Sequence, residues 1–179
     1  MNMIANQILL HNMYDMGAIK KETMAEFKTK DIIIKLERKD AQLWYTDTSY
    51  KYLCIITFID RLTNREILKL SLSEIDVFVL MDNYDNYMET LDIDYGSLLT
   101  PMIYSAIDNS KYYFSLDNKT GTSYDDLYLI VYQYNPENNT TLKRIQILLS
   151  TNELIDLFDL IYFTFLIDMV SNNFESIYG

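Results

Sequence analysis

The hydrophobic pattern of the first half of the chain changes its period once. Apolar and polar residues alternate through 32–37 and 68–72, which predicts strands with one buried face. Residues 52–59 form a β-branched and aromatic run that is typical of a strand buried on both faces. From Ser73 onward the apolar residues recur at helical spacing, and Asp76 completes a capping pair with Ser73. The first half therefore predicts strands from Met24 onward, then a helix that begins at Ser73 and ends near residues 92–96.

The second half repeats this order of elements. Strands are predicted at 102–107, 112–116, 127–134 and 145–149, with turns at 117–121 and 135–139. Ser150 and Glu153 then form a capping box. The helix that follows carries one apolar face, made of Leu154, Leu157, Phe158, Ile161 and Phe165.

The two halves align over a strand and a helix. Leu68, Leu70, Leu72 and Ser73 fall on Ile145, Ile147, Leu149 and Ser150. This match predicts an internal duplication of a ββββα unit, with repeats at about 24–95 and 100–170. The alternative is that any unit of strand, cap and helix needs these residue classes. The expected fold is α+β, with two four-stranded antiparallel sheets packed together with two helices.

Residues 1–22 show no firm periodicity and are expected to form an arm or a short helix before a single domain at 23–179. The N-terminus lacks the basic and apolar regions of a signal peptide, and Cys54 is the only cysteine. These features predict a reducing compartment, the cytoplasm. Asp156, Asp159 and Asp168 interrupt the apolar segment 154–170, so no contact with a membrane is expected.

In both halves the last strand runs into a Ser-capped helix almost without a loop, at residues 67–75 and 145–153. This order resembles the single-stranded-DNA-binding fold shared by Whirly proteins and the eukaryotic positive transcriptional coactivator, over about residues 24–170. The resemblance implies a non-enzymatic protein that binds single-stranded nucleic acid on its sheet surfaces. It also leaves a homo-oligomer open. The resemblance leaves a viral source open, and with it the host cytoplasm. The usage of Asn, Ile, Tyr, Lys and Asp suits an AT-rich genome.

The net charge of −11 is unevenly placed along the chain. Residues 20–69 carry 11 Lys/Arg against 8 Asp/Glu, whereas residues 70–179 carry 4 Lys/Arg against 17 Asp/Glu. An acidic whole argues against non-specific binding of nucleic acid, and the positive first half softens that objection. There, aromatic rings that can stack on bases stand beside cations that can hold phosphates. The predicted nucleic-acid-binding residues are Lys28, Lys30, Lys35, Arg38, Lys39, Trp44, Tyr45, Tyr50, Lys51 and Lys69. The alternative is that the aromatic residues fill the core and the sheet edges.

Catalytic chemistry has few candidate residues. His11, the only histidine, lies in the least structured segment, and the chain has no glycine-rich phosphate-binding motif. Asp92, Asp94, Asp125 and Asp126 carry hard oxygen ligands, but their spacing is that of solvated loops rather than of a calcium-binding loop. No catalytic residue, metal site or cofactor is therefore predicted.

A protein partner is the main alternative to nucleic acid. An acidic stripe, made of Asp82, Asp85, Glu89, Asp92 and Asp94, lies on and after the first predicted helix. Such a stripe can occupy the basic groove of another protein, as an acidic inhibitor would, although it is also typical of a solvated helix face. A structural or assembly subunit of a virus is the remaining alternative.

Overall fold

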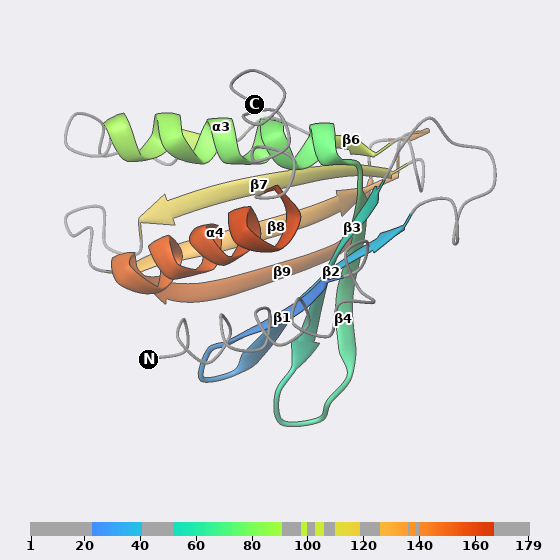
Figure 1. Ribbon diagram of the computed structural model, residues 1–179. Coiled ribbons are helices and arrows are strands. Elements are labelled where there is room, and N and C mark those ends of the chain that lie inside the picture. The colour runs from blue at the N-terminus through green and yellow to red at the C-terminus, as the bar shows by residue number, and fades with distance from the viewer. Residues whose placement is uncertain are drawn as a thin grey trace, which may run out of the picture.

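The computed structural model describes residues 23–40, 52–90, 98–99, 103–105, 110–118, 126–135, 137–138 and 140–166. Within these ranges two sheets and two helices alternate along the chain (Figure 1). The first sheet contains β1 (Thr23–Lys28), β2 (Ile32–Asp40), β3 (Tyr52–Asp60) and β4 (Glu66–Leu72). These strands pair in sequence order, and every pair is antiparallel. Helix α3 (Glu74–Thr90) follows β4 directly.

The second sheet contains five strands, where four were expected. They are β5 (Leu98–Leu99), β6 (Ile103–Ser105), β7 (Ser110–Asn118), β8 (Asp126–Tyr134) and β9 (Thr141–Ser150). β5 pairs with residues 115–116 of β7, and β6 pairs with residues 110–112 of the same strand. Two short strands therefore lie along one edge of β7, and the sheet is four strands wide. Helix α4 (Thr151–Phe165) follows β9 directly, and the predicted α+β plan of two antiparallel sheets and two helices is confirmed.

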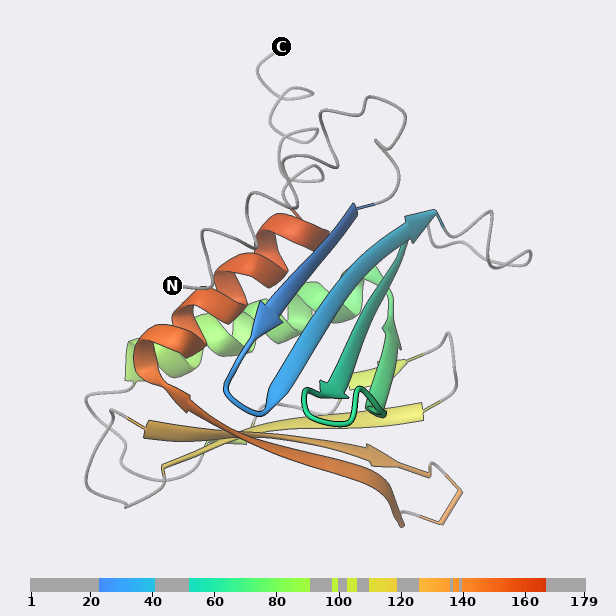
Figure 2. The same cartoon turned by 90° about the horizontal axis from the view of Figure 1, so that it is seen from below.

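Both sheets and both helices contribute to one hydrophobic core. Its members include the two predicted strand faces, Leu68, Leu70 and Leu72 from β4 and Ile145, Ile147 and Leu149 from β9. Figure 2 shows the two sheets meeting at a steep angle, with α3 and α4 side by side against them. The outer face of each sheet lies opposite this core.

Reciprocal capping bonds fix the start of both helices. The Ser73 N–H donates to Asp76 Oδ2 at 3.0 Å, and the Asp76 N–H donates to Ser73 Oγ at 3.2 Å. The Ser150 N–H donates to Glu153 Oε1 and the Glu153 N–H to Ser150 Oγ, both at 3.1 Å. Each pair of bonds gives acceptors to two backbone N–H groups that have no partner within the helix. Both predicted caps are confirmed.

The predicted apolar face of α4 is confirmed, because Leu154, Leu157, Phe158, Ile161 and Phe165 are all buried. Neither helix in the described ranges combines the length and the apolarity that crossing a lipid bilayer requires. The N-terminal arm predicted at residues 1–22 lies outside the described ranges. The division into two repeats and the internal duplication stay predictions.

Candidate nucleic-acid interface

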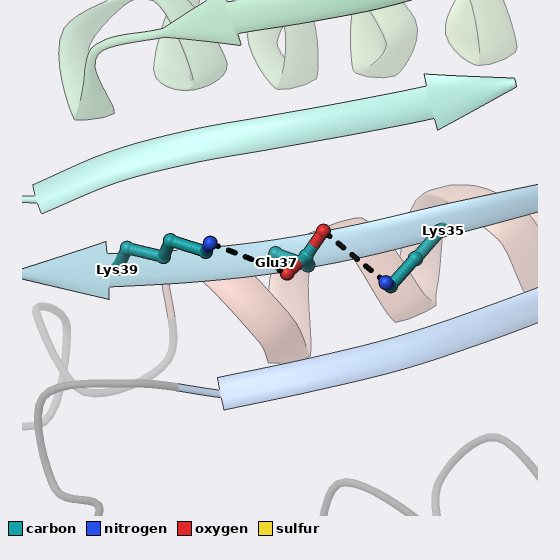
Figure 3. Close-up of polar contacts among 3 residues, drawn as sticks. All are labelled: Lys35, Glu37 and Lys39. Atoms are coloured by element: carbon teal, nitrogen blue, oxygen red, sulfur yellow. Dashed lines mark ion pairs between the residues drawn. The ribbon is translucent and has the colours of Figure 1, made fainter. Parts of the chain in front are cut away.

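The outer face of the first sheet carries several of the lysines predicted to bind phosphate. Lys35 and Lys39 alternate with core residues along β2, and Glu37 lies between them (Figure 3). The Nζ atoms of Lys35 and Lys39 lie 3.5 and 3.7 Å from the two carboxylate oxygens of Glu37. The two lysine side chains are only 33% and 26% exposed. One carboxylate thus compensates part of the positive charge expected on this face.

The structure corrects the role predicted for Arg38. Its side chain is 1% exposed, because the period of two along β2 places it on the inner face with Ile34 and Leu36. The guanidinium carbon lies 4.7 Å from the ring centroid of Tyr52, in a cation–π arrangement. A guanidinium buried in this way does not reach a phosphate on the outer face, and its place is in the packing between β2 and β3.

Cys54 lies opposite Arg38 in the register of β2 and β3 and is fully buried. Burial, and then the charge of Glu74, raise the pKa of the Cys54 thiol well above its ordinary value. The thiol therefore stays protonated and packs as a small apolar side chain.

The remaining predicted residues fall into two groups. Lys28, Lys30 and Lys69 are exposed. The aromatic members and one lysine lie outside the described residues, namely Trp44, Tyr45, Tyr50 and Lys51. Their joint role in stacking and phosphate binding stays a prediction.

Uncharged, non-aromatic residues occupy the centre of the outer face of the first sheet. At the centre, Leu53, Ile55 and Thr57 of β3 are 6%, 7% and 7% exposed. Among the strand residues that the structure describes, no aromatic ring points outward from this sheet. The described part of this face therefore offers cations for phosphates and no ring on which a base can stack.

The outer face of the second sheet is different, because tyrosines line it. The inner face of β7 carries Tyr112, Phe114 and Leu116, and the inner face of β8 carries Leu127, Leu129 and Val131. Since side chains alternate along a strand, Tyr113 of β7 and Tyr128, Tyr132 and Tyr134 of β8 point outward. The register sets Tyr132 opposite Tyr113 on one side and opposite Arg144 of β9 on the other.

Three of these tyrosines touch one another and a cation. The ring centroids of Tyr113 and Tyr134 are 5.0 Å apart at 74°, and those of Tyr132 and Tyr134 are 6.1 Å apart at 41°. The guanidinium carbon of Arg144 lies 5.4 Å from the ring centroid of Tyr132. The three rings are half-buried, and Arg144 is exposed. We name Tyr113, Tyr132, Tyr134 and Arg144 the tyrosine face.

The positive charge of the second half gathers at the same end of the sheet. Residues 70–179 contain only four cations, and three of them are Lys111, Lys143 and Arg144. Lys111 pairs with Tyr134 in the register, and Lys143 and Arg144 lie near the start of β9. The opposite end of the sheet carries Asp117 and Asp126. The tyrosine face is therefore locally basic in an acidic protein.

Part of this surface follows from the sequence pattern. Strands are predicted at 112–116 and 127–134, and the alternation of a strand places Tyr113 on the face opposite Tyr112 and Phe114. The register of β7, β8 and β9 brings Lys111 and Arg144 beside the rings, whereas Lys143 pairs with Gln133 and lies on the other face.

Comparison with known proteins gives structural similarity alone. No protein-family model matches the chain, and no curated protein matches it. The chain resembles the Whirly proteins. Two solved structures are similar to it, that of the plant transcriptional regulator PBF-2 and that of WHY3 from Arabidopsis thaliana. Each has a TM-score of 0.44 and 11% sequence identity, and each match covers 87% of this chain. The matches cover 88% of the PBF-2 chain and 96% of the WHY3 chain.

Proposed function

We propose that this protein is a non-enzymatic binder of single-stranded nucleic acid and that the tyrosine face is its contact surface. The observation that supports this is the contact of Tyr113, Tyr132 and Tyr134 with one another and with Arg144 on an outward sheet face. Unpaired bases stack on aromatic rings, and cations beside the rings hold the phosphates. A duplex hides the faces of its bases, so this combination favours a single strand.

The small number of cations beside the rings limits how many phosphates the site can bind. Lys111 and Arg144 are the two cations beside the rings, within a chain of net charge −11. Each phosphate neutralised on a single strand contributes about 0.7 to the slope of log affinity against log salt, so two such phosphates give a slope of about −1.4. Stacking adds about 1–3 kcal/mol per base and depends little on salt. We therefore propose a short site in which stacking carries much of the affinity.

The lysines of the first sheet keep a role in this proposal. Lys28, Lys30 and Lys69 are exposed on the half of the chain with a positive balance. Exposed cations raise the local concentration of a polyanion before it binds. We propose that they attract the strand, while the tyrosine face holds it.

The test is a fluorescence anisotropy titration with a labelled 12-nucleotide single strand at low salt. We expect the wild type to bind the single strand and to bind a duplex of the same length more weakly. Tyr132→Ala should weaken binding by about 1–3 kcal/mol, whereas Tyr132→Phe, which keeps the ring, should bind as the wild type does. Phe78→Ala is the control, because Phe78 is an exposed aromatic residue of α3 and not of the second sheet. No binding at low salt, or equal losses in Phe78→Ala and Tyr132→Ala, contradicts the proposal.

A basic protein partner is the second candidate. Asp82, Asp85 and Glu89 are exposed along α3, so three carboxylates of the predicted acidic stripe face solvent. Charge of one sign along a helix steers a complementary basic surface. Absence of nucleic-acid binding, together with salt-sensitive capture of a basic protein that Asp82→Asn and Asp85→Asn abolish, would favour this function.

A further inference from the structure

A small hollow opens at the edge of the second sheet, next to the tyrosine face. Its volume is about 120 Å³. The β1–β2 turn, residues 29–32, forms one wall, and Gln146, Leu148 and Glu153 contribute to the other. Figures 1 and 2 show this turn beside β9 and the start of α4. Residues from both halves of the chain therefore line the hollow, and neither half forms it alone.

Gln146 connects the hollow to the tyrosine face. It points outward from β9 on the same side as Arg144, and an Arg144 Nη2–H donates to Gln146 Oε1 at 2.6 Å. Two residues along one face of a strand are about 6.6 Å apart, so the hollow begins one step beyond Arg144. A strand held at Tyr132 and Arg144 thus has its neighbouring nucleotide within reach of the hollow.

The walls of the hollow suit a base better than a phosphate. The carboxylates of Asp31 and Glu153 line it and would repel an anion, whereas a nucleobase is neutral. Leu148, 42% exposed, offers an apolar wall for the face of a ring. The amide of Gln146 keeps donors for a base edge while its oxygen accepts from Arg144. Lys30 is exposed at the wall and is placed for the adjoining phosphate.

The volume of the hollow limits the size of the base that can enter it. A cavity of about 150 Å³ holds one benzene ring, so about 120 Å³ fits a single six-membered ring better than a fused pair. We infer that the hollow takes one unstacked pyrimidine base of the strand that lies on the tyrosine face, with the Gln146 amide bonded to the base edge. This inference rests on the proposed function and adds a preference for pyrimidine over purine.

The experiment measures the ratio of affinities for labelled (dT)₁₂ and (dA)₁₂ by fluorescence anisotropy at low salt. We expect a preference for (dT)₁₂ of about tenfold in the wild type. Leu148→Trp, which fills the hollow, and Gln146→Leu, which removes the amide, should lower the ratio toward one. Stacking of adenines within (dA)₁₂ affects wild type and variants alike, so the fall of the ratio measures the contribution of the hollow.

Leu142→Trp is the matched control. Leu142 is also an exposed leucine of β9, on the other side of Arg144 from the hollow, and its substitution should leave the ratio unchanged. A wild-type ratio near one, or a ratio unchanged in both Leu148→Trp and Gln146→Leu, overturns the inference. In that case binding of both oligonucleotides, weakened by Tyr132→Ala, would still support the proposed function. No binding of either oligonucleotide overturns both.

Discussion

The ring of Tyr84 in α3 lies flat against the ring of Phe158 in α4, with centroids 4.1 Å apart and planes inclined by 6°. The two side chains are 6% and 2% exposed. Burial, and then the charges of Asp159 and Asp85, raise the pKa of Tyr84 to about 12, so its phenol is neutral at physiological pH. The stack directly joins the helix of the first half to the helix of the second.

This stack predicts an energetic coupling between the helices. We expect Tyr84→Leu and Phe158→Leu each to lower the free energy of unfolding, and the double variant to lose less than the sum of the two. The difference should be about 0.5–1.5 kcal/mol, the energy of an aromatic pair beyond its buried area. Urea denaturation of the four proteins measures it. Losses that add within the error of the measurement would show that the rings do not stack in solution.

The inner face of β4 gives a prediction with a matched control inside the same chain. Leu70 is fully buried in the core, whereas Leu62 in the β3–β4 turn is 92% exposed. Leu70→Ala should lower the free energy of unfolding by about 2–5 kcal/mol, because it removes buried carbons and leaves a cavity. Leu62→Ala should change it by less than about 0.5 kcal/mol. Equal urea midpoints for the two variants would contradict the assignment of β4.

The sequence predicted best the features that depend on neighbours in the chain. The alternation at Leu68, Leu70 and Leu72 follows from the period of a strand, and the bonds between Ser73 and Asp76 span three residues. Local rules decide both, so no knowledge of the rest of the fold was needed. The turn after β3 is held by a bond of the same short range, in which the Thr63 hydroxyl donates to Asp60 Oδ2 at 2.6 Å and lowers the pKa of Asp60.

The candidate site was predicted less well, because it depends on contacts between distant segments. The pattern that placed Ile34 and Leu36 inward also places Arg38 inward, but its charge suggested a phosphate contact instead. The position of Arg144 over Tyr132 depends on the register of β8 and β9, which no local pattern specifies. The hollow beside Gln146 requires the β1–β2 turn of the other half.

The two capping boxes predict matched effects at two positions. Ser73→Ala and Ser150→Ala should each lower the free energy of unfolding by about 0.5–2 kcal/mol, because each leaves a backbone N–H of the first helical turn without its acceptor. Replacement by Thr, which keeps the hydroxyl, should cost less. Thermal or urea unfolding measures all four variants. An Ala variant as stable as its Thr counterpart would argue against the cap at that position.

The acidic surface of α4 predicts a pH dependence. Desolvation, and then the charge of Asp156, raise the pKa of Asp159 above its ordinary value. A carboxyl that ionises less readily in the folded protein than in the unfolded chain destabilises the fold once it is ionised. The loss of stability therefore develops as the pH rises from the pKa of the carboxyl in the unfolded chain, about 3.9, through its raised pKa in the folded protein. Asp159→Asn should therefore stabilise the protein at pH 7, by less than about 1 kcal/mol because the side chain is exposed.

The gain from Asp159→Asn should shrink as the pH falls below about 4, where the wild-type carboxyl is protonated in both states. Urea denaturation at several pH values measures the difference between variant and wild type. Glu137→Gln in the β8–β9 turn is the control, because it removes the same charge from an exposed position distant from α4. A gain that grows toward acid pH would have the wrong sign for a raised pKa.

Removing cations from one sheet face or from the other should change the salt dependence of binding differently. On the first sheet, Lys39 and Lys69 belong to the site predicted from the sequence, and Lys39 already lies 3.7 Å from a carboxylate oxygen of Glu37. On the second sheet, Lys111 and Arg144 lie at the tyrosine-rich end. If the strand is held there, Lys111→Gln with Arg144→Gln should reduce the salt slope by about 1.4, or about 0.7 for each phosphate that is no longer neutralised.

The matched pair, Lys39→Gln with Lys69→Gln, changes the net charge by the same amount on the other sheet. It should lower affinity slightly at low salt, through weaker attraction, and leave the slope nearly unchanged. Anisotropy titrations of a labelled single strand between about 50 and about 200 mM salt measure both slopes. A larger decrease of slope in the first-sheet pair would place the phosphates on the lysines of β2 and β4. Stacking would then require the aromatic residues of segment 44–52 in place of Tyr132 and its neighbours.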